Sequence, residues 1–159
     1  MANRNPYRSL PAARRVELLT HAIKAHRDAR ALYAQRLVGK GGFRAVTLMS
    51  WPPERLAREI VRLGAETSHD ELEMLQLLYV ELEPAIQSTF LDAAGVKHEN
   101  GKMDEELTQP FADAEAVSRA AAVVQERHGE DGVNYLRTLA RYSADGWPGI
   151  DAIVDALEG

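Results

Sequence analysis

The stretch from Ser68 to Gly95 places the strongest constraint on how this chain folds. Apolar residues recur there at steps of three and four, which is the spacing of one face of an α-helix. They are Leu72, Leu75, Tyr79, Leu82, Ile86, Phe90 and Ala93. Ser68 and Glu71 fit a capping box at the start of the stretch, and Gly95 supplies a left-handed stop at its end. The pattern predicts a long helix with one side buried in a core.

Pro84 lies in the middle of this predicted helix. A proline inside a helix removes one backbone hydrogen bond and crowds the preceding turn, so the helix kinks. Because the apolar spacing continues unbroken across Pro84, we expect one bent helix rather than two unrelated ones. A second apolar stripe, formed by Leu77, Val80 and Leu91, indicates burial on more than one side. We therefore expect this helix at the centre of an all-α fold.

A second long helix is predicted from Pro11 to about Val38, ending at the glycines of residues 39–42. Its apolar residues, among them Leu19 and Tyr33, cover an arc of about 200° at about 100° per residue. An ordinary surface helix has an apolar stripe of about 100°. The wide arc indicates a helix that is either wrapped by its own domain or paired with a second chain, and it favours a homodimer.

The rest of the chain also has helical spacing, and residues 1–10 are expected to form a loose arm. Further helices are predicted at 43–49, 51–64, 113–128, 130–143 and 147–158. Asn100-Gly101 favours a tight hairpin turn, within a polar connection at 97–110. The predicted fold is a single-domain bundle of roughly six or seven helices over residues 1–159, with 97–110 as the candidate internal boundary.

Composition narrows the class of protein. The chain of 159 residues has no cysteine, which excludes disulfides, thiolate metal sites and cysteine nucleophiles and favours a reducing compartment. The N-terminus has no apolar leader segment, and no run approaches the length of a membrane span. We therefore expect a soluble, cytoplasmic protein that does not bind membranes.

Charge is distributed unevenly along the chain. Residues 1–64 carry 13 Lys and Arg against 4 Asp and Glu, a net charge of +9, whereas residues 65–159 carry 6 against 20, a net charge of −14. Such asymmetry occurs in nucleic-acid-binding proteins, and also where two charged halves neutralise each other. We favour neutralisation. If a polyanion binds, the candidate residues are Arg14, Arg15, Lys24, Arg27, Arg55, Arg58 and Arg62.

Motifs for metal, phosphate or nucleophilic chemistry are incomplete. Glu66 and His69 match one Glu-x-x-His of di-metal bundles, but Glu66 precedes the predicted helix and no second copy exists. His21 and His26 diverge on a helical wheel, and we expect His26 to be buried. Residues 39–42 lack the strand and the Ser/Thr of a phosphate loop, and no nucleophile motif occurs. We predict no metal, cofactor or catalytic residue, although spatial pairs of carboxylates are invisible in a sequence.

The predicted helix pair within 113–143 could be taken for a DNA-binding helix-turn-helix. Its second helix offers Arg137 and Arg141, but Glu130 and Asp131 stand at its entry in an acidic half, so we reject this interpretation. The order of elements matches no family signature. The sequence favours a small interaction protein that forms a homodimer without a catalytic role; a polyanion-binding module and an enzyme with a helical pocket are the alternatives.

Overall fold

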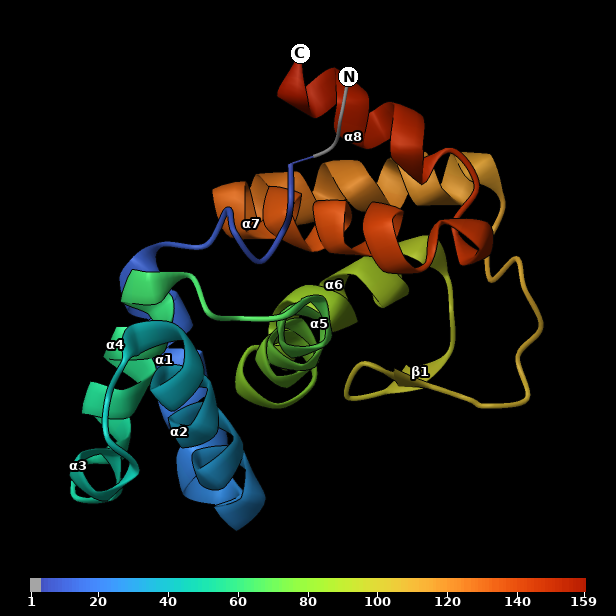
Figure 1. Cartoon of the computed structure of the whole chain (residues 1–159). Helices are drawn as coiled ribbons and strands as arrows, with labels where there is room; N and C mark the ends of the chain where they lie inside the picture. Colours follow the sequence, from blue (N-terminus) through green and yellow to red (C-terminus); the bar gives the residue numbers. More distant parts are fainter. Residues whose placement is uncertain (1–3) are drawn as a thin grey trace. The chain divides into compact units, whose positions relative to one another are not determined.

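The computed structural model describes residues 4–159 and is all-α, as predicted (Figure 1). Its α-helices are α1 (Ala12–Ala25), α2 (Arg27–Gly41), α3 (Ala45–Met49), α4 (Pro53–Leu63), α5 (Ser68–Gln76), α6 (Pro84–Ala94), α7 (Ala114–Tyr142) and α8 (Ile150–Glu158). A π-helical turn η1 (Leu77–Leu82), a 3₁₀ turn η2 (Ala144–Gly146) and a hairpin of β1 (His98–Glu99) and β2 (Lys102–Met103) complete it. None of the helices formed by residues 4–159 has the length and apolar character needed to cross a membrane.

The chain divides into two compact units. The N-terminal unit is Leu10–Met74, and the C-terminal unit combines residues 4–9 with Leu75–Gly159. The polar connection at 97–110, proposed above as an internal boundary, lies inside the C-terminal unit. The assignment of residues 1–159 to a single domain stays a prediction, and the two units are described separately below.

The N-terminal unit is built from α1, α2 and α4, which pack against one another, with α3 packed on α2. Its fully buried side chains come from all four helices: Leu18, Leu19, Leu37, Leu48, Leu56 and Ile60. The single helix predicted for residues 11–38 is wrong, because His26 is extended (φ −131°, ψ 115°) and separates α1 from α2. The wide apolar arc is the sum of two narrower stripes on two helices. His26 itself is exposed, which corrects its predicted burial.

The C-terminal unit is organised around α7, which packs on α6 and on α8. Asp113 caps the start of α7, since its Oδ1 accepts a hydrogen bond of 2.8 Å from the N–H of Ala116. The predicted helices 113–128 and 130–143 are both present under the label α7, and Gly129, whose φ of 56° and ψ of −131° are not helical, separates them at a kink. Gly132 then lies so close to Val124 that an added Cβ would stand 2.5 Å from its carbonyl oxygen.

Residues 4–9 are anchored in the C-terminal unit, and the loose arm predicted for them is wrong. Tyr7 is fully buried, and the Asn134 side chain donates a hydrogen bond of 2.8 Å to the Pro6 carbonyl oxygen. A buried tyrosine ring removes a large apolar area from water, which offsets the entropy lost on ordering the segment. Residues 1–3 of the predicted arm lie outside the described residues.

The predicted kink at Pro84 is confirmed, but the helix is interrupted there rather than only bent. In η1 the N–H of Glu83 donates to the Leu78 carbonyl at 2.7 Å, one residue further back than in an α-helix. Glu83 then leaves the helical region (φ −130°, ψ 60°), and α6 begins at Pro84. Because Pro84 has no N–H, the hydrogen-bond ladder cannot continue across it.

The helix count follows from these local departures. Eight labelled α-helices lie within residues 4–159, against the roughly six or seven predicted, because the breaks at His26 and Glu83 add two, while the two helices on either side of Gly129 share the label α7. The hairpin turn is confirmed: Asn100 (φ 51°) and Gly101 (φ 86°) have the left-handed conformations of a type I′ turn.

The capping box at the start of α5 is shifted by one residue from the prediction. The Asp70 N–H donates to Thr67 Oγ1 at 3.2 Å, and the Thr67 N–H donates to Asp70 Oδ2 at 2.8 Å. Two overlapping boxes, Thr67–Asp70 and Ser68–Glu71, fit the same stretch of sequence. The first is used because Asp70 also pairs with Arg36, so the N-cap is Thr67 and not Ser68.

Replacing Thr67 by alanine should lower the free energy of unfolding by about 1 kcal/mol, because the N–H of Asp70 loses its acceptor. The matched variant Ser68→Ala should change it by less than about 0.5 kcal/mol, as for most exposed surface positions. Urea denaturation of both variants checks the assignment. A larger loss at Ser68 than at Thr67 would contradict it.

Candidate functional site

A buried ion pair links α2 to the start of α5 in the N-terminal unit. Both oxygens of Asp70 accept from the Arg36 guanidinium, with 3.1 Å between Oδ1 and Nη2. Burial acts to raise the pKa of Asp70, but the hydrogen bonds and charge of Arg36, together with those from Thr67, outweigh it and lower the pKa. The adjacent Tyr33 has its pKa raised by burial and by the negative charge of Asp70. Asp70 is therefore held as a partnered anion, which suits a structural role better than that of a general base.

The Glu-x-x-His match is divided by the fold. Glu66 is buried, with its Oε2 3.4 Å from Arg15 Nη1. His69 is exposed on the first turn of α5 and lies 2.9 Å from Glu73 Oε1. Among residues 4–159 no cluster of three or more His, Asp or Glu side chains could hold a metal ion. The two residues thus serve separate local pairs.

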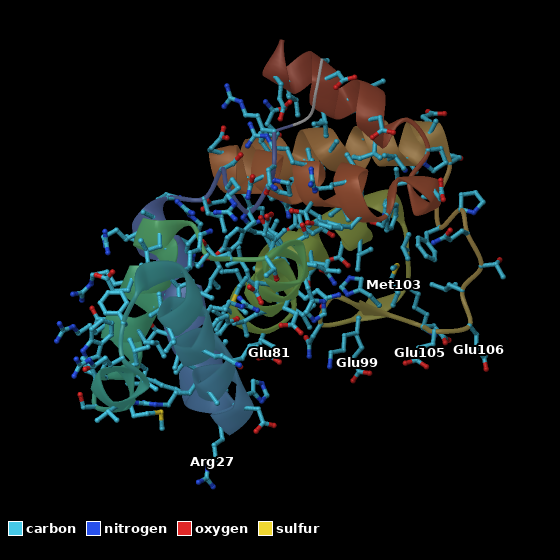
Figure 2. All side chains as sticks on the ribbon, in the orientation of Figure 1. Arg27, Glu81, Glu99, Met103, Glu105 and Glu106 are labelled. Carbon is cyan, nitrogen blue, oxygen red and sulfur yellow. The ribbon has the colours of Figure 1, made fainter. Side chains whose placement is uncertain are left out.

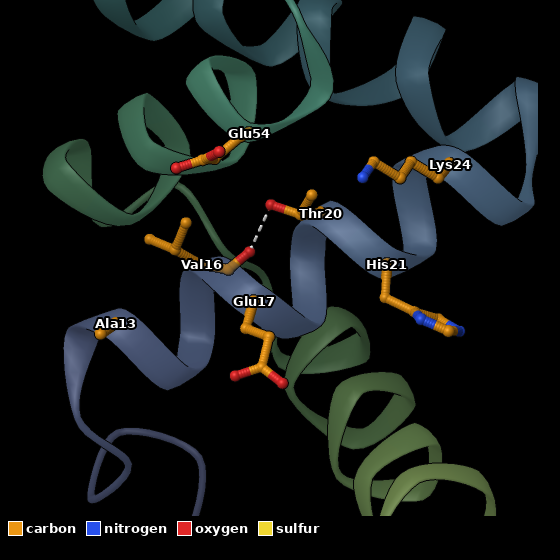
Figure 3. Close-up of a pocket in the computed structure, with 7 residues that line it drawn as sticks. All are labelled: Ala13, Val16, Glu17, Thr20, His21, Lys24 and Glu54. Carbon is orange, nitrogen blue, oxygen red and sulfur yellow. Dashed lines mark hydrogen bonds between the residues drawn. The ribbon is translucent and has the colours of Figure 1, made fainter.

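A polar groove of about 400 Å³ follows α1 beside α4 (Figure 3). Figure 3 shows Val16, Thr20 and Lys24 on the side of α1 that faces Glu54, whereas Glu17 and His21 point to another side. The Thr20 hydroxyl donates to the Val16 carbonyl at 2.7 Å, so no neighbouring base activates it. The Thr20 hydroxyl in this groove is therefore not arranged as an activated nucleophile.

The seven candidate anion-binding residues are spread over α1, α2 and α4. Four of them each form an ion pair with a carboxylate: Arg14 with Glu17, Arg15 with Glu66, Arg58 with Glu54 and Arg62 with Glu59. Arg55 stacks over the Trp51 ring, with 4.2 Å from its guanidinium carbon to the ring centroid. Lys24 lines the α1 groove, and Arg27 extends away from the start of α2 (Figure 2). That the seven act together as one anion-binding patch stays a prediction.

The short helix α3 exposes apolar side chains that sequence reasoning did not single out. Val46 is 85% exposed and Met49 59% exposed, and their spacing of three residues puts both on one side of the turn. Leu48 is fully buried beneath them. The Arg30 guanidinium donates to the carbonyl oxygens of Met49 (3.0 Å) and Trp51 (2.6 Å), which holds the end of α3 in place. Val46 and Met49 are thus displayed on an anchored element.

The surroundings of α3 are basic. Residues 29–53 contain four Lys and Arg and no Asp or Glu. Arg44, just before α3, and Arg55, on α4, are exposed, and among the described side chains neither forms an ion pair. We call Arg44, Val46, Met49 and Arg55 the α3 surface. The only sequence feature that indicates this surface is the short length of the apolar segment between Gly42 and Pro52. A segment of that length cannot bury both of its sides.

A second groove, of about 730 Å³, lies in the C-terminal unit between the hairpin and the start of α6. It is lined by Val80, Pro84 and hairpin residues from Lys97 to Asp104. His98 in its wall has both ring nitrogens occupied: Nδ1 accepts from the Gly101 N–H at 2.9 Å, and Nε2 lies 2.6 Å from Asp92 Oδ1. Figure 2 shows Glu99, Glu105 and Glu106 pointing outward from the hairpin and the following loop. Neither nitrogen of His98 is available as a base in this arrangement.

The Arg36–Asp70 pair should make stability fall in acid. A carboxyl whose pKa is lower in the folded state than in the unfolded state, where it is about 3.9, stabilises the fold at pH values above the unfolded-state pKa. This contribution is lost as the pH falls through the folded-state pKa. Between about pH 5 and pH 2 the free energy of unfolding should therefore fall more steeply for the wild type than for Asp70→Asn. Urea denaturation across that range measures it. The exposed carboxylate variant Glu73→Gln should keep the wild-type slope, and equal slopes for all three proteins would contradict the assignment.

Oligonucleotides should bind weakly, because four of the seven candidate cations already form ion pairs with carboxylates. Fluorescence anisotropy of labelled single- and double-stranded DNA at about 50 and 200 mM salt tests this, since phosphate contacts weaken steeply with salt. Micromolar binding at the lower salt, lost at the higher salt and in the Arg55→Glu, Arg58→Glu, Arg62→Glu triple variant, would contradict it.

Comparison of the chain with protein-family models, curated proteins and solved structures gives no match in any of the three. No function can therefore be carried over from a relative. The chemistry of the described side chains has to support any functional proposal, and the α3 surface is the feature that points most directly to a partner.

Proposed function

We propose that this protein is a non-catalytic interaction module whose α3 surface binds an acidic, partly apolar segment of another protein. The observation that carries the proposal is the exposure of Val46 and Met49 on one side of a helix that Leu48 and Arg30 hold in place. Burying a Val or Met side chain completely contributes about 1.5–3 kcal/mol. Two such side chains cannot offset the cost of association alone, so charged contacts must add to them.

Charge selects the kind of partner. Arg44 directly precedes α3 and Arg55 lies on the following helix, and the described side chains form no ion pair with either arginine. An acidic segment supplies the complementary charge. In a symmetric dimer that used this surface, each basic residue would face the same surface of the second copy, and like charges would repel. An acidic partner is therefore favoured over self-association through α3.

The homodimer predicted from the wide apolar arc loses that particular support. Leu19 and Tyr33, which would lie in such a contact, are buried within the chain itself. The homodimer stays an untested prediction. Polyanion binding is also less well supported, because Trp51 is buried and cannot stack on bases.

Selection from a displayed peptide library tests the proposal. Peptides enriched on the wild-type protein should combine carboxylates with apolar residues and should bind at least about tenfold more weakly to the Val46→Ser, Met49→Ser double variant. Both positions are exposed, so the fold should be unchanged. The matched control is Leu107→Ser, which removes an exposed apolar side chain from the C-terminal unit.

Two further measurements separate the competing outcomes. Arg44→Glu should weaken the selected peptides, and binding should fall with salt, since exposed charges are screened. Enriched peptides that bind the double variant as well as the wild type would overturn the proposal. Sedimentation that shows a wild-type dimer and a monomeric double variant would assign α3 to self-association instead.

A further inference from the structure

One side of α2 is exposed and carries no charged residue. It consists of Ala31, Leu32, Gln35, Val38 and Gly39, all exposed, which we call the α2 face. At about 100° per residue, the five positions lie within about 120° around the helix. Leu32 and Val38 are large apolar side chains that are 48% and 39% exposed. The α2 face is therefore an apolar surface of the N-terminal unit that is separate from the α3 surface.

The two arginines in the middle of α2 are directed away from this face. Arg30 and Arg36 lie about 100° or more around the helix from Gln35. The Arg30 guanidinium donates to two carbonyl oxygens at the end of α3, and the Arg36 guanidinium donates to Asp70. An acidic partner therefore finds no cation on the α2 face, whereas a second copy of the same face meets no like charge.

We propose that the α2 face is the contact of a homodimer, in which α2 packs against α2 of a second copy in antiparallel orientation. The twofold axis of this pair passes beside Gln35, so residues about equally far from Gln35 on either side come level with each other. Leu32 then lies against Gly39 of the partner subunit, and Val38 lies against Ala31 of the partner subunit. Each large side chain thus meets a small residue, as close packing requires. A Cβ on Gly39 would have no atom within 4 Å in the single chain, so the space above it is open to a partner's side chain.

The polar groups of such a pair also complement one another. A primary amide has both donors and an acceptor, so the two Gln35 side chains can bond to each other across the axis. Asp28 in the first turn of α2 lies on the same side, about 20° from Gln35. In the antiparallel pair it lies beside the last turn of the partner's α2, which carries Lys40. A parallel pair would instead place like charges together at both ends, so charge selects the antiparallel orientation.

The homodimer proposed here does not use the residues that first indicated one. Leu19 and Tyr33 are buried in the core, whereas the α2 face is exposed. A contact of one helix from each copy buries less than the roughly 1,200–2,000 Å² of a stable interface, so we expect a weak dimer. The α3 surface is not part of this contact, and the inference is therefore independent of the proposed function.

Analytical ultracentrifugation of the full chain tests the contact. Between about 10 μM and 1 mM the wild type should shift from monomer toward dimer. The Leu32→Glu, Val38→Glu double variant should raise the dissociation constant at least about tenfold, because unpaired carboxylates would be buried in the contact. Both positions are exposed, so the fold should be unchanged. The matched control is the Val46→Ser, Met49→Ser double variant, which should dimerise like the wild type.

Gly39→Leu separates a dimer contact from an effect on the fold. In the single chain the new side chain meets open space, and leucine favours a helix more than glycine does. The free energy of unfolding, measured at a concentration where the protein is monomeric, should therefore not fall. In the dimer the new side chain takes the space of Leu32 of the partner subunit, so the dissociation constant should rise at least about tenfold.

Single cysteines report the orientation of the two helices, because the chain has no cysteine of its own. Under oxidation Gln35→Cys should form a disulfide-linked dimer, because residue 35 of each copy lies beside the axis. Ala31→Cys should not, because the two cysteines would be about 12 Å apart along the helix axis, and a disulfide spans at most about 7 Å between Cα atoms.

The proposal fails on any of three results. The first is a wild type that stays monomeric at about 1 mM. The second is a dimer that the Leu32→Glu, Val38→Glu variant leaves intact, or that the Val46→Ser, Met49→Ser variant abolishes. The third is an Ala31→Cys variant that cross-links as readily as Gln35→Cys, which would indicate parallel helices.

Discussion

The geometry of the N-terminal unit depends on one buried carboxylate, that of Asp70. It accepts from the Thr67 N–H, which fixes the start of α5, and from Arg36, which fixes α2 against that start. Removing one partner would leave the other charge buried and uncompensated, which costs several kcal/mol in comparable pairs, about 3–5. Arg30, six residues earlier on α2, holds the end of α3 through two carbonyl oxygens. A single helix thus uses two arginines to position two later segments of the chain.

The existence of the helices could be predicted from the sequence, and several of their ends could not. Periodicity shows which side of a helix is apolar, but it does not show where a helix breaks. No proline or glycine at His26 marks the break that the packing of α1 and α2 imposes. The sequence also does not distinguish Thr67 from Ser68 as N-cap, because two capping boxes overlap. The ion pair of Asp70 with Arg36, which is far away in sequence, favours Thr67. Stops that depend on backbone conformation alone, such as Gly95 with φ of 75°, were predictable.

The candidate site was less accessible to sequence reasoning than the fold. Ion pairs on one helix, such as Glu54 with Arg58, follow from a spacing of four residues. They explain why some of the candidate anion-binding residues are neutralised. The exposure of Val46 and Met49 depends on tertiary structure, since the same residues could equally form a buried helical turn. The contacts of His98 with Asp92 and Gly101 require the hairpin to be folded first. The features on which the functional proposal rests therefore exist only in the folded chain.

The discontinuity of the C-terminal unit has a consequence for the order in which the chain acquires its structure during synthesis. Residues 4–9 are made long before their partners, which include Asn134 and Glu158, and the Arg4 N–H lies 3.3 Å from a Glu158 carboxylate oxygen. The N-terminal unit, Leu10–Met74, has all its residues early and can fold as a local module on the ribosome. The C-terminal unit must close a loop of more than a hundred residues, so it is completed only after Glu158 has been synthesised.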